Sequence, residues 1–169
     1  VMKLQYLNPL PEADMVVVQT EDFNSAELTA DLRERTAKHA GALVTFTGYV
    51  RDYAGEKETH TLFLEHYPGM CEREIGDICQ QAQSRWNTAE PVVVHRVGEM
   101  HNGEQIVFVG VASAHRGDAF RASDFIIDAL KTRAPFWKRE TLANGEQFWV
   151  QQRESDARKT QEWETKQAS

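Results

Sequence analysis

The chain has 169 residues, of which 41% are hydrophobic and 27% charged, and its formal net charge is −7. Acidic balance argues against general nucleic-acid binding, which needs surface that neutralises phosphates. The chain has no apolar run of the roughly 20 residues that a membrane span requires. Its two cysteines and the lack of a recognisable signal peptide predict a cytoplasmic protein. We expect one domain over residues 1–169, with flexible ends at about 1–14 and 160–169.

Hydrophobic patterning in the first half predicts two helices and three strands. In chain order these are a strand at 15–20, a helix from Asn24 or Ser25 to Gly41, strands at 42–50 and 61–67, and a helix over 70–86. A polar turn separates the second and third strands, so we expect them to form a hairpin. In the second helix, Cys71 and Cys79 share an apolar stripe with Ile75 and Ile78, which favours core packing over a reactive thiol.

The second half continues with strands at 91–100 and 104–114, joined by an Asn102-Gly103 turn. A helix over 117–133 follows, which Pro135 should end because it disfavours helical geometry at the residue before it. A turn and strand at 143–150 precede a polar helix in the tail. Helices thus alternate with pairs of strands, which favours an α+β fold with mostly antiparallel pairing.

A cluster of cations surrounds a rigid, bulky segment after the third helix. Four of them, Lys131, Arg133, Lys138 and Arg139, lie around Pro135-Phe136-Trp137. Lys131 shares a narrow helical sector with Phe120 and Ile127, so it ends a partly apolar face at the last helical turn. Two interpretations remain open: a solvated lysine near the helix carbonyls, or a half-buried ammonium that binds an anion or moves a proton.

Other cations lie where strands end. His115 and Arg116 stand between a strand and a helix start, where free backbone N–H groups attract anions, although a simple capping turn explains them equally well. Arg51 follows the end of another strand. Spacing alone therefore allows an anion pocket built from Arg51, His115, Arg116, Lys131 and Lys138. The histidine and cysteine spacing predicts no metal site, and no glycine-rich phosphate loop occurs.

Six strings in one order resemble the catalytic large subunit of molybdopterin synthase. They are "VTFTGYVRD", "LEHYPGM", "HRVGE", "FVGVASAHRGDAF", "LKTRAPFWKRE" and "QRESD", and the match runs from about Gly41 to Trp163. The resemblance implies an α/β hammerhead with an additional antiparallel β subdomain. It also implies a homodimer of large subunits, with a small ubiquitin-like sulfur-carrier subunit at each end, so that the assembly is a heterotetramer.

The reaction that the resemblance implies is sulfur transfer. The thiocarboxylate at the C-terminal Gly-Gly of the carrier would donate sulfur to cyclic pyranopterin monophosphate, and two transfers would build the dithiolene of molybdopterin. The large subunit would need no cofactor, since the substrate is a pterin phosphate and the partner supplies the sulfur. Both reactants are anions, so local cations would be needed to bring them together, even on an acidic protein.

The resemblance also assigns roles to individual residues. Lys131 and Lys138 would be the catalytic pair, with Lys131 acting at the reacting carbonyl and sulfur and Lys138 stabilising anionic intermediates. The phosphate and pterin would be held by Arg51, His115, Arg116 and Arg153. The tunnel for the glycine tail would be lined by Phe46, Pro135 and Phe136, because a tail without side chains suits a narrow channel. Two alternatives are a non-catalytic scaffold that binds a ubiquitin-like tail, and an enzyme that forms a Schiff base on Lys131.

Overall fold

The computed structural model describes residues 15–51, 59–150 and 154–167. Its helices are α1 (Ser25–Thr36), α2 (Met70–Arg85), α3 (Arg116–Thr132) and α4 (Glu154–Gln167). Its strands are β1 (Val16–Gln19), β2 (Ala42–Tyr49), β3 (Thr59–His66), β4 (Val92–Arg96), β5 (Gly98–His101), β6 (Gln105–Ser113), β7 (Phe136–Leu142) and β8 (Gln147–Trp149).

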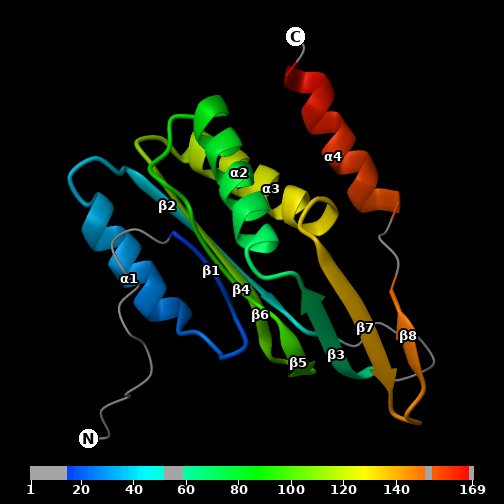
Figure 1. Ribbon diagram of the computed structural model, residues 1–169. Coiled ribbons are helices and arrows are strands. Elements are labelled where there is room, and N and C mark those ends of the chain that lie inside the picture. Colours follow the sequence, from blue (N-terminus) through cyan, green and yellow to red (C-terminus); the bar gives the residue numbers. More distant parts are fainter. Residues whose placement is uncertain (1–14, 52–58, 151–153, 168–169) are drawn as a thin grey trace, which may run out of the picture.

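The first sheet has the strand order β1-β4-β6-β2, with β1 parallel to β4 and the other pairs antiparallel. Helix α1 covers one face, where Leu32 packs with Phe108 and other buried side chains. Helices α2 and α3 cover the opposite face, where Ile75 and Ile126 pack against Val109 (Figure 1). The sheet is therefore the middle layer of the molecule, and β2 is one of its edge strands.

The second sheet has the order β5-β3-β7-β8 and is antiparallel throughout. The chain leaves the first sheet after β4 and enters the second as β5, whose first residue, Gly98, has φ 83°. Leu62, Leu64 and Met100 form the buried core beneath the second sheet. Strand β7 follows α3 directly, so this sheet extends from the end of that helix (Figure 1).

This architecture confirms the predicted α+β class with mainly antiparallel pairing. The expected helices are found, and α3 ends at Thr132 with Arg133 as its C-cap, as Pro135 required. The tail helix also forms as α4. The single domain with flexible ends that we expected over residues 1–169 stays a prediction.

Three expectations about strands and turns were wrong. Strands β2 and β3 form no hairpin, because β2 pairs with β6 in one sheet and β3 pairs with β5 and β7 in the other. The strand expected at 91–100 is broken into β4 and β5, which join different sheets. Gly41 does not end α1, which stops at Thr36; instead, Gly41 lies so close to the carbonyl of Ala114 that a Cβ atom would clash there.

Helix α4 packs against the layer formed by α2 and α3, and its main aromatic contact is Trp163. The ring of Trp163 stands edge-on to Trp86 and Phe125, and its indole N–H donates to Asp128 Oδ2 at 2.9 Å. Arg85 adds a hydrogen bond from Nη1 to the carbonyl oxygen of Trp163 at 3.2 Å. The polar tail is thus tied to α2 and α3 by these contacts.

Candidate functional site

The junction between α3 and β7 is held in place by Arg133, one of the four clustered cations. Arg133 Nε and Nη2 donate to Glu74 Oε1 at 2.9 and 2.8 Å, and its Nη1 donates to Gln81 Oε1 at 2.9 Å. Both partners lie on α2, so the bonds fix the end of α3 against that helix. Cys71, also on α2, donates its thiol to the carbonyl oxygen of Pro135 at 3.5 Å. These contacts set the direction in which β7 begins.

Along β7, side chains alternate between the two faces of the sheet. Phe136, Lys138 and Glu140 point to the inner side, and Trp137 and Arg139 to the outer side, as the burial of Glu140 and the exposure of Trp137 show. Lys138 Nζ lies 3.4 Å from Glu140 Oε1, and the Glu140 side chain is only 5% exposed. The amino group of Lys138 is therefore held next to a buried carboxylate.

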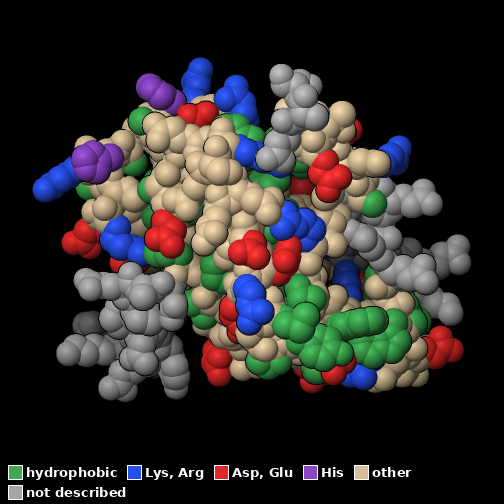
Figure 2. Space-filling view, turned by 45° about the horizontal axis from the view of Figure 1, so that its top comes forward, with side chains coloured by type: hydrophobic (Ala, Val, Ile, Leu, Met, Phe, Trp, Pro, Cys, Tyr) green, Lys and Arg blue, Asp and Glu red, His purple; other side chains and the backbone are tan. Residues whose placement is uncertain are grey.

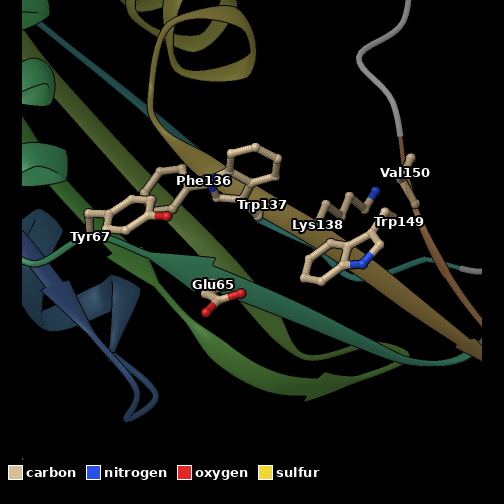
Figure 3. A pocket seen from close by; sticks show the side chains of 7 residues that line it. All are labelled: Glu65, Tyr67, Phe136, Trp137, Lys138, Trp149 and Val150. Carbon is tan, nitrogen blue, oxygen red and sulfur yellow. The ribbon is translucent and has the colours of Figure 1, made fainter.

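Lys138 lines an open cavity of about 670 Å³. Its lining residues come from β3, β7, β8 and the segments that adjoin them: Glu65, Tyr67, Phe136, Trp137, Lys138, Trp149 and Val150. In Figure 3, Lys138 extends from β7 toward β8, where Trp149 and Val150 lie. The backbone N–H of Val150 donates to the Lys138 carbonyl at 2.8 Å, which closes β8 onto this part of β7. The cavity thus combines aromatic walls with an amino group.

Phe136 rests on a buried histidine that sequence analysis did not single out. The rings of His95 and Phe136 are stacked with centroids 4.1 Å apart and planes at 21°. Burial lowers the pKa of His95 to about 4, and the nearby His66 lowers it further, against a raising effect of the Arg96 carbonyl. Since that carbonyl can only accept, Nδ1 carries the proton and donates at 2.9 Å. His95 is a neutral platform beneath one wall of the cavity.

The two cysteines are buried rather than placed for chemistry. Burial raises the pKa of the Cys71 thiol, and burial raises that of Cys79 to about 12. Thiols with raised pKa values are poor nucleophiles near neutral pH. The expectation that they serve core packing is consistent with these surroundings.

Lys131 lies in the last turn of α3, and its side chain is exposed in this single chain. It is outside the lining of the cavity, and β7 begins shortly after it. Arg51 is also exposed and follows β2 at the end that pairs with the start of β6. Because α3 packs along β2 and β6, Lys131 and Arg51 belong to the same end of the first sheet (Figure 1).

His115 and Arg116 lie at the opposite end of α3. His115 is the N-cap residue, both side chains are exposed, and they follow Ser113, which pairs with the first residue of β2. Arg116 and Lys131 are separated by almost the whole helix, which at 1.5 Å per residue is about 22 Å. One chain therefore does not bring the five cations of the predicted pocket together.

The residues expected to line a tail tunnel have separate surroundings. Phe46 on β2 and Phe136 on β7 both pack partly buried against the core beneath α2 and α3. Phe136 also lines the cavity, whereas Phe46 and Pro135 do not. Arg153 lies outside the described residues.

Sequence reasoning missed the polar partner and the stacking platform of this site. Glu140 stands two residues beyond Lys138, the spacing that places two side chains on one face of a strand. That signal becomes useful only once residues 136–142 are seen as a strand. His95 had no such signal, because its contact with Phe136 joins segments 41 positions apart.

Among residues 15–51, 59–150 and 154–167, no three His, Cys, Asp or Glu side chains gather as metal ligands. Within the same ranges, no helix is both long and apolar enough to cross a membrane.

The comparisons with known proteins agree with each other. The MoaE protein family model matches residues 18–133. The molybdopterin synthase catalytic subunit of Escherichia coli (strain K12) is 47% identical over 148 residues, which cover 88% of this chain and 97% of that one. The molybdopterin biosynthesis MoaE protein from Burkholderia ambifaria MC40-6 superposes with a TM-score of 0.74 at 42% identity, covering 88% and 96%. A complex of subunits 1 and 2 of molybdopterin-converting factor from Helicobacter pylori 26695 shares the fold, with a TM-score of 0.68 at 19% identity, covering 82% and 92%.

Fold and site together define an α+β protein with an aromatic-walled cavity in which Lys138 offers an ammonium group to a ligand. The matches then identify the family: the chain belongs to the molybdopterin synthase catalytic subunits, the MoaE family. As a member, it is a sulfurtransferase of molybdenum cofactor biosynthesis. The family resemblance seen in the sequence is thereby confirmed.

Proposed function

We propose that the chain transfers sulfur from the C-terminal thiocarboxylate of a small ubiquitin-like carrier subunit to cyclic pyranopterin monophosphate. Two such transfers build the dithiolene of molybdopterin. The observation that carries the proposal is the cavity lined by Lys138 together with aromatic side chains, since it offers a cation to an extended, anionic tail. A cytoplasmic location belongs to the same proposal.

The two lysines have different surroundings, which supports different roles. Lys138 is held beside Glu140, so its ammonium can stay fixed while negative charge develops on the carbonyl under attack. Lys131 is more exposed and lies near the negative end of the α3 macrodipole. We assign Lys131 to the reacting carbonyl and sulfur, as proton donor and acceptor or charge stabiliser, and Lys138 to the anionic intermediates.

The phosphate and the pterin would be held by Arg51, His115, Arg116 and Arg153. His115 and Arg116 stand at the start of α3, where unpaired backbone N–H groups favour an anion. Phe46, Pro135 and Phe136 would guide the glycine tail toward the lysines. Of these three, Phe136 has direct support, because it lines the cavity beside Lys138.

A second copy of the chain would complete the site. Arg116 and Lys131 lie about 22 Å apart along α3, too far for one small substrate to reach both. Strand β2 is a long sheet edge of eight residues, and such an edge usually has a partner or a cover. Antiparallel pairing of two β2 edges would place the Ala42 end of one copy beside the Tyr49 end of the other. That arrangement would bring His115 and Arg116 of one copy toward Arg51 and Lys131 of the next.

The assembly proposed is therefore a homodimer of this chain with a carrier subunit on each copy, a heterotetramer. The Helicobacter pylori relative, a complex of two kinds of subunit, supports the carrier as a stable partner.

Reconstitution from purified components tests the proposal. The protein, thiocarboxylated carrier and cyclic pyranopterin monophosphate should together yield molybdopterin. Lys131→Ala and Lys138→Ala should each lose most of the turnover while keeping the wild-type circular dichroism spectrum and carrier affinity. Near-normal turnover in Lys131→Ala would refute the role of that lysine.

The alternative is a non-catalytic scaffold that binds a ubiquitin-like tail. The enzyme, unlike the scaffold, must also bind the phosphorylated pterin. Titration of the pterin precursor into the protein should show binding that weakens in Arg51→Ala and Arg116→Ala. Binding that is unaffected by both substitutions, together with no sulfur transfer, would favour the scaffold.

A further inference from the structure

Helix α2 holds the guanidinium of Arg133 at two points. Figure 2 shows Lys and Arg side chains next to Asp and Glu side chains near the middle of its face, so charge pairing alone does not distinguish this arginine. Its Nε and Nη2 donate to Glu74, and its Nη1 donates to Gln81. These two partners are seven residues apart, which places them two turns apart on one side of α2. The planar group is therefore fixed both across and along the helix.

Arg133 stands between the two lysines that the proposed function requires. Lys131 is two residues before it, in the last turn of α3, and Lys138 is five residues after it, on β7. The backbone N–H of Arg133 donates to the Ala129 carbonyl at 2.8 Å, so this residue is also the C-cap of the helix. A shift of Arg133 against α2 would therefore change the position of Lys131 relative to Lys138.

The contact between Arg133 and Glu74 is better suited to orientation than to stability. The two side chains are 29% and 32% exposed, and ion pairs that solvent reaches add little to the free energy of folding. A guanidinium with several fixed donors sets a direction as well as supplying a charge. Misplacement of a reacting group by about 1 Å can slow an enzyme by about a hundredfold. A contact that orients two reacting lysines can thus affect the rate more than the stability.

A second arginine makes the Glu74 carboxylate necessary for this arrangement. Burial lowers the pKa of Arg85 on α2, the nearby Arg133 lowers it further, and Glu164 raises it. Arg85 also donates to the carbonyl of Trp163, so two guanidinium groups lie close together where α2, α3 and α4 meet. Without the carboxylate of Glu74, repulsion from Arg85 would push Arg133 toward solvent.

We propose that Arg133 is a positioning residue for sulfur transfer: by fixing the turn between α3 and β7 on α2, it sets the distance between the two lysines. This inference rests on the proposed function, which assigns the chemistry to Lys131 and Lys138. Arg133 lies outside the lining of the cavity, so it acts through the lysines. The chemical step should therefore respond more strongly to its loss than the binding of the carrier or the pterin does.

Sulfur transfer from thiocarboxylated carrier tests this role. Arg133→Met should lower the single-turnover rate about tenfold to a hundredfold. Its KM for the carrier in steady-state turnover and its Kd for the pterin precursor should stay within about twofold of the wild-type values. Arg133→Lys should recover only part of the rate, because an ammonium has no planar group that can hold both partners. A full rate in Arg133→Lys would assign the role to charge and overturn the inference.

Two substitutions on α2 repeat the test without changing the segment that joins the lysines. Glu74→Ala should slow transfer as much as Arg133→Met does, and Gln81→Ala by a smaller factor, since it keeps the ion pair. Arg133→Met combined with Glu74→Ala should be no slower than the slower single variant, because both changes break the same contact. Losses that multiply in the double variant would overturn the inference.

Two control variants separate position from loss of charge and loss of stability. Arg35→Met removes an arginine 32% exposed whose ion pair with Asp31 lies within α1, and it should transfer sulfur at the wild-type rate. Leu28→Ala opens a cavity beneath α1, on the other face of the first sheet. It should lower the urea midpoint without slowing transfer by the folded protein. Equal slowing in Leu28→Ala and Arg133→Met would reduce the role to stability and overturn the inference.

Hydrogen exchange followed by mass spectrometry reads the position of the turn without any activity. Residues 132–140 should exchange faster in Arg133→Met, whereas α1 should exchange as in the wild type. Unchanged exchange over 132–140, or wild-type rates in Arg133→Met and Glu74→Ala, would overturn the positioning role and leave the proposed function intact. A wild-type protein that transfers no sulfur from carrier to pterin would refute the proposed function itself, and the positioning role with it.

Discussion

His95 should make the stability of this protein sensitive to acid in a defined pH window. Burial against Phe136 lowers the pKa of His95 from 6.5 to about 4. Between these two pH values the unfolded chain binds a proton on His95 and the folded chain does not, so acid favours unfolding. At about 1.36 kcal/mol per pKa unit, the difference corresponds to about 3 kcal/mol, which is fully lost once the pH falls to about 4.

Urea unfolding of the wild type and His95→Phe across this window measures the effect. Phenylalanine keeps a ring against Phe136 but has no proton to bind, so other acid-sensitive groups act equally in both proteins. The wild type should lose about 3 kcal/mol more unfolding free energy than His95→Phe between about pH 7.5 and pH 4. Equal losses in the two proteins would refute the argument that burial keeps His95 neutral.

Three further substitutions test contacts that support the site and the fold. Glu140→Gln removes the buried charge beside Lys138 and should lower the sulfur-transfer rate by about tenfold to a hundredfold in single-turnover assays; an unchanged rate would show that the pairing is dispensable. Trp163→Phe removes the hydrogen bond to buried Asp128 and should cost about 1–3 kcal/mol in urea unfolding, whereas a wild-type midpoint would mean that α4 is not anchored there. Gly41→Ala forces a Cβ atom against a neighbouring carbonyl and should cost about 1–3 kcal/mol; a melting temperature equal to that of the wild type would contradict this close approach.

The helices were predictable because their signals are local. In α3, the buried residues Ala119, Ala122 and Ile126 recur at helical spacing, and Pro135 marks the end of the helix from sequence alone. The pairing of β2 was not predictable in this way. Its partner β6 lies about 60 positions away, and the nearest strand in sequence belongs to the other sheet.

Strand β7 was missed because two of its inward positions carry charged side chains. A half-exposed strand normally turns apolar residues inward and charged residues outward. Here Lys138 and Glu140 face inward as a pair, while Trp137 and Trp149 of the neighbouring strand face solvent. A site that needs a held ammonium accounts for this inward pair.

Sequence spacing also grouped cations that are far apart in the folded chain. Grouping Arg116 with Lys131 treats cations as neighbours because they flank one helix. The rise of that helix alone separates them by about 22 Å. A site that uses both therefore needs two copies of the chain.

Mixing two inactive variants tests this claim most directly. When Arg116→Ala and Lys131→Ala are combined under conditions that exchange subunits, sulfur transfer should return to about a quarter of the wild-type turnover, since half of the dimers are mixed and each holds one intact site. The control mixture of Lys131→Ala with Lys138→Ala should stay inactive, because each site takes both lysines from one copy. No recovery in the first mixture, with subunit exchange verified by mass spectrometry, would contradict a site shared between two copies.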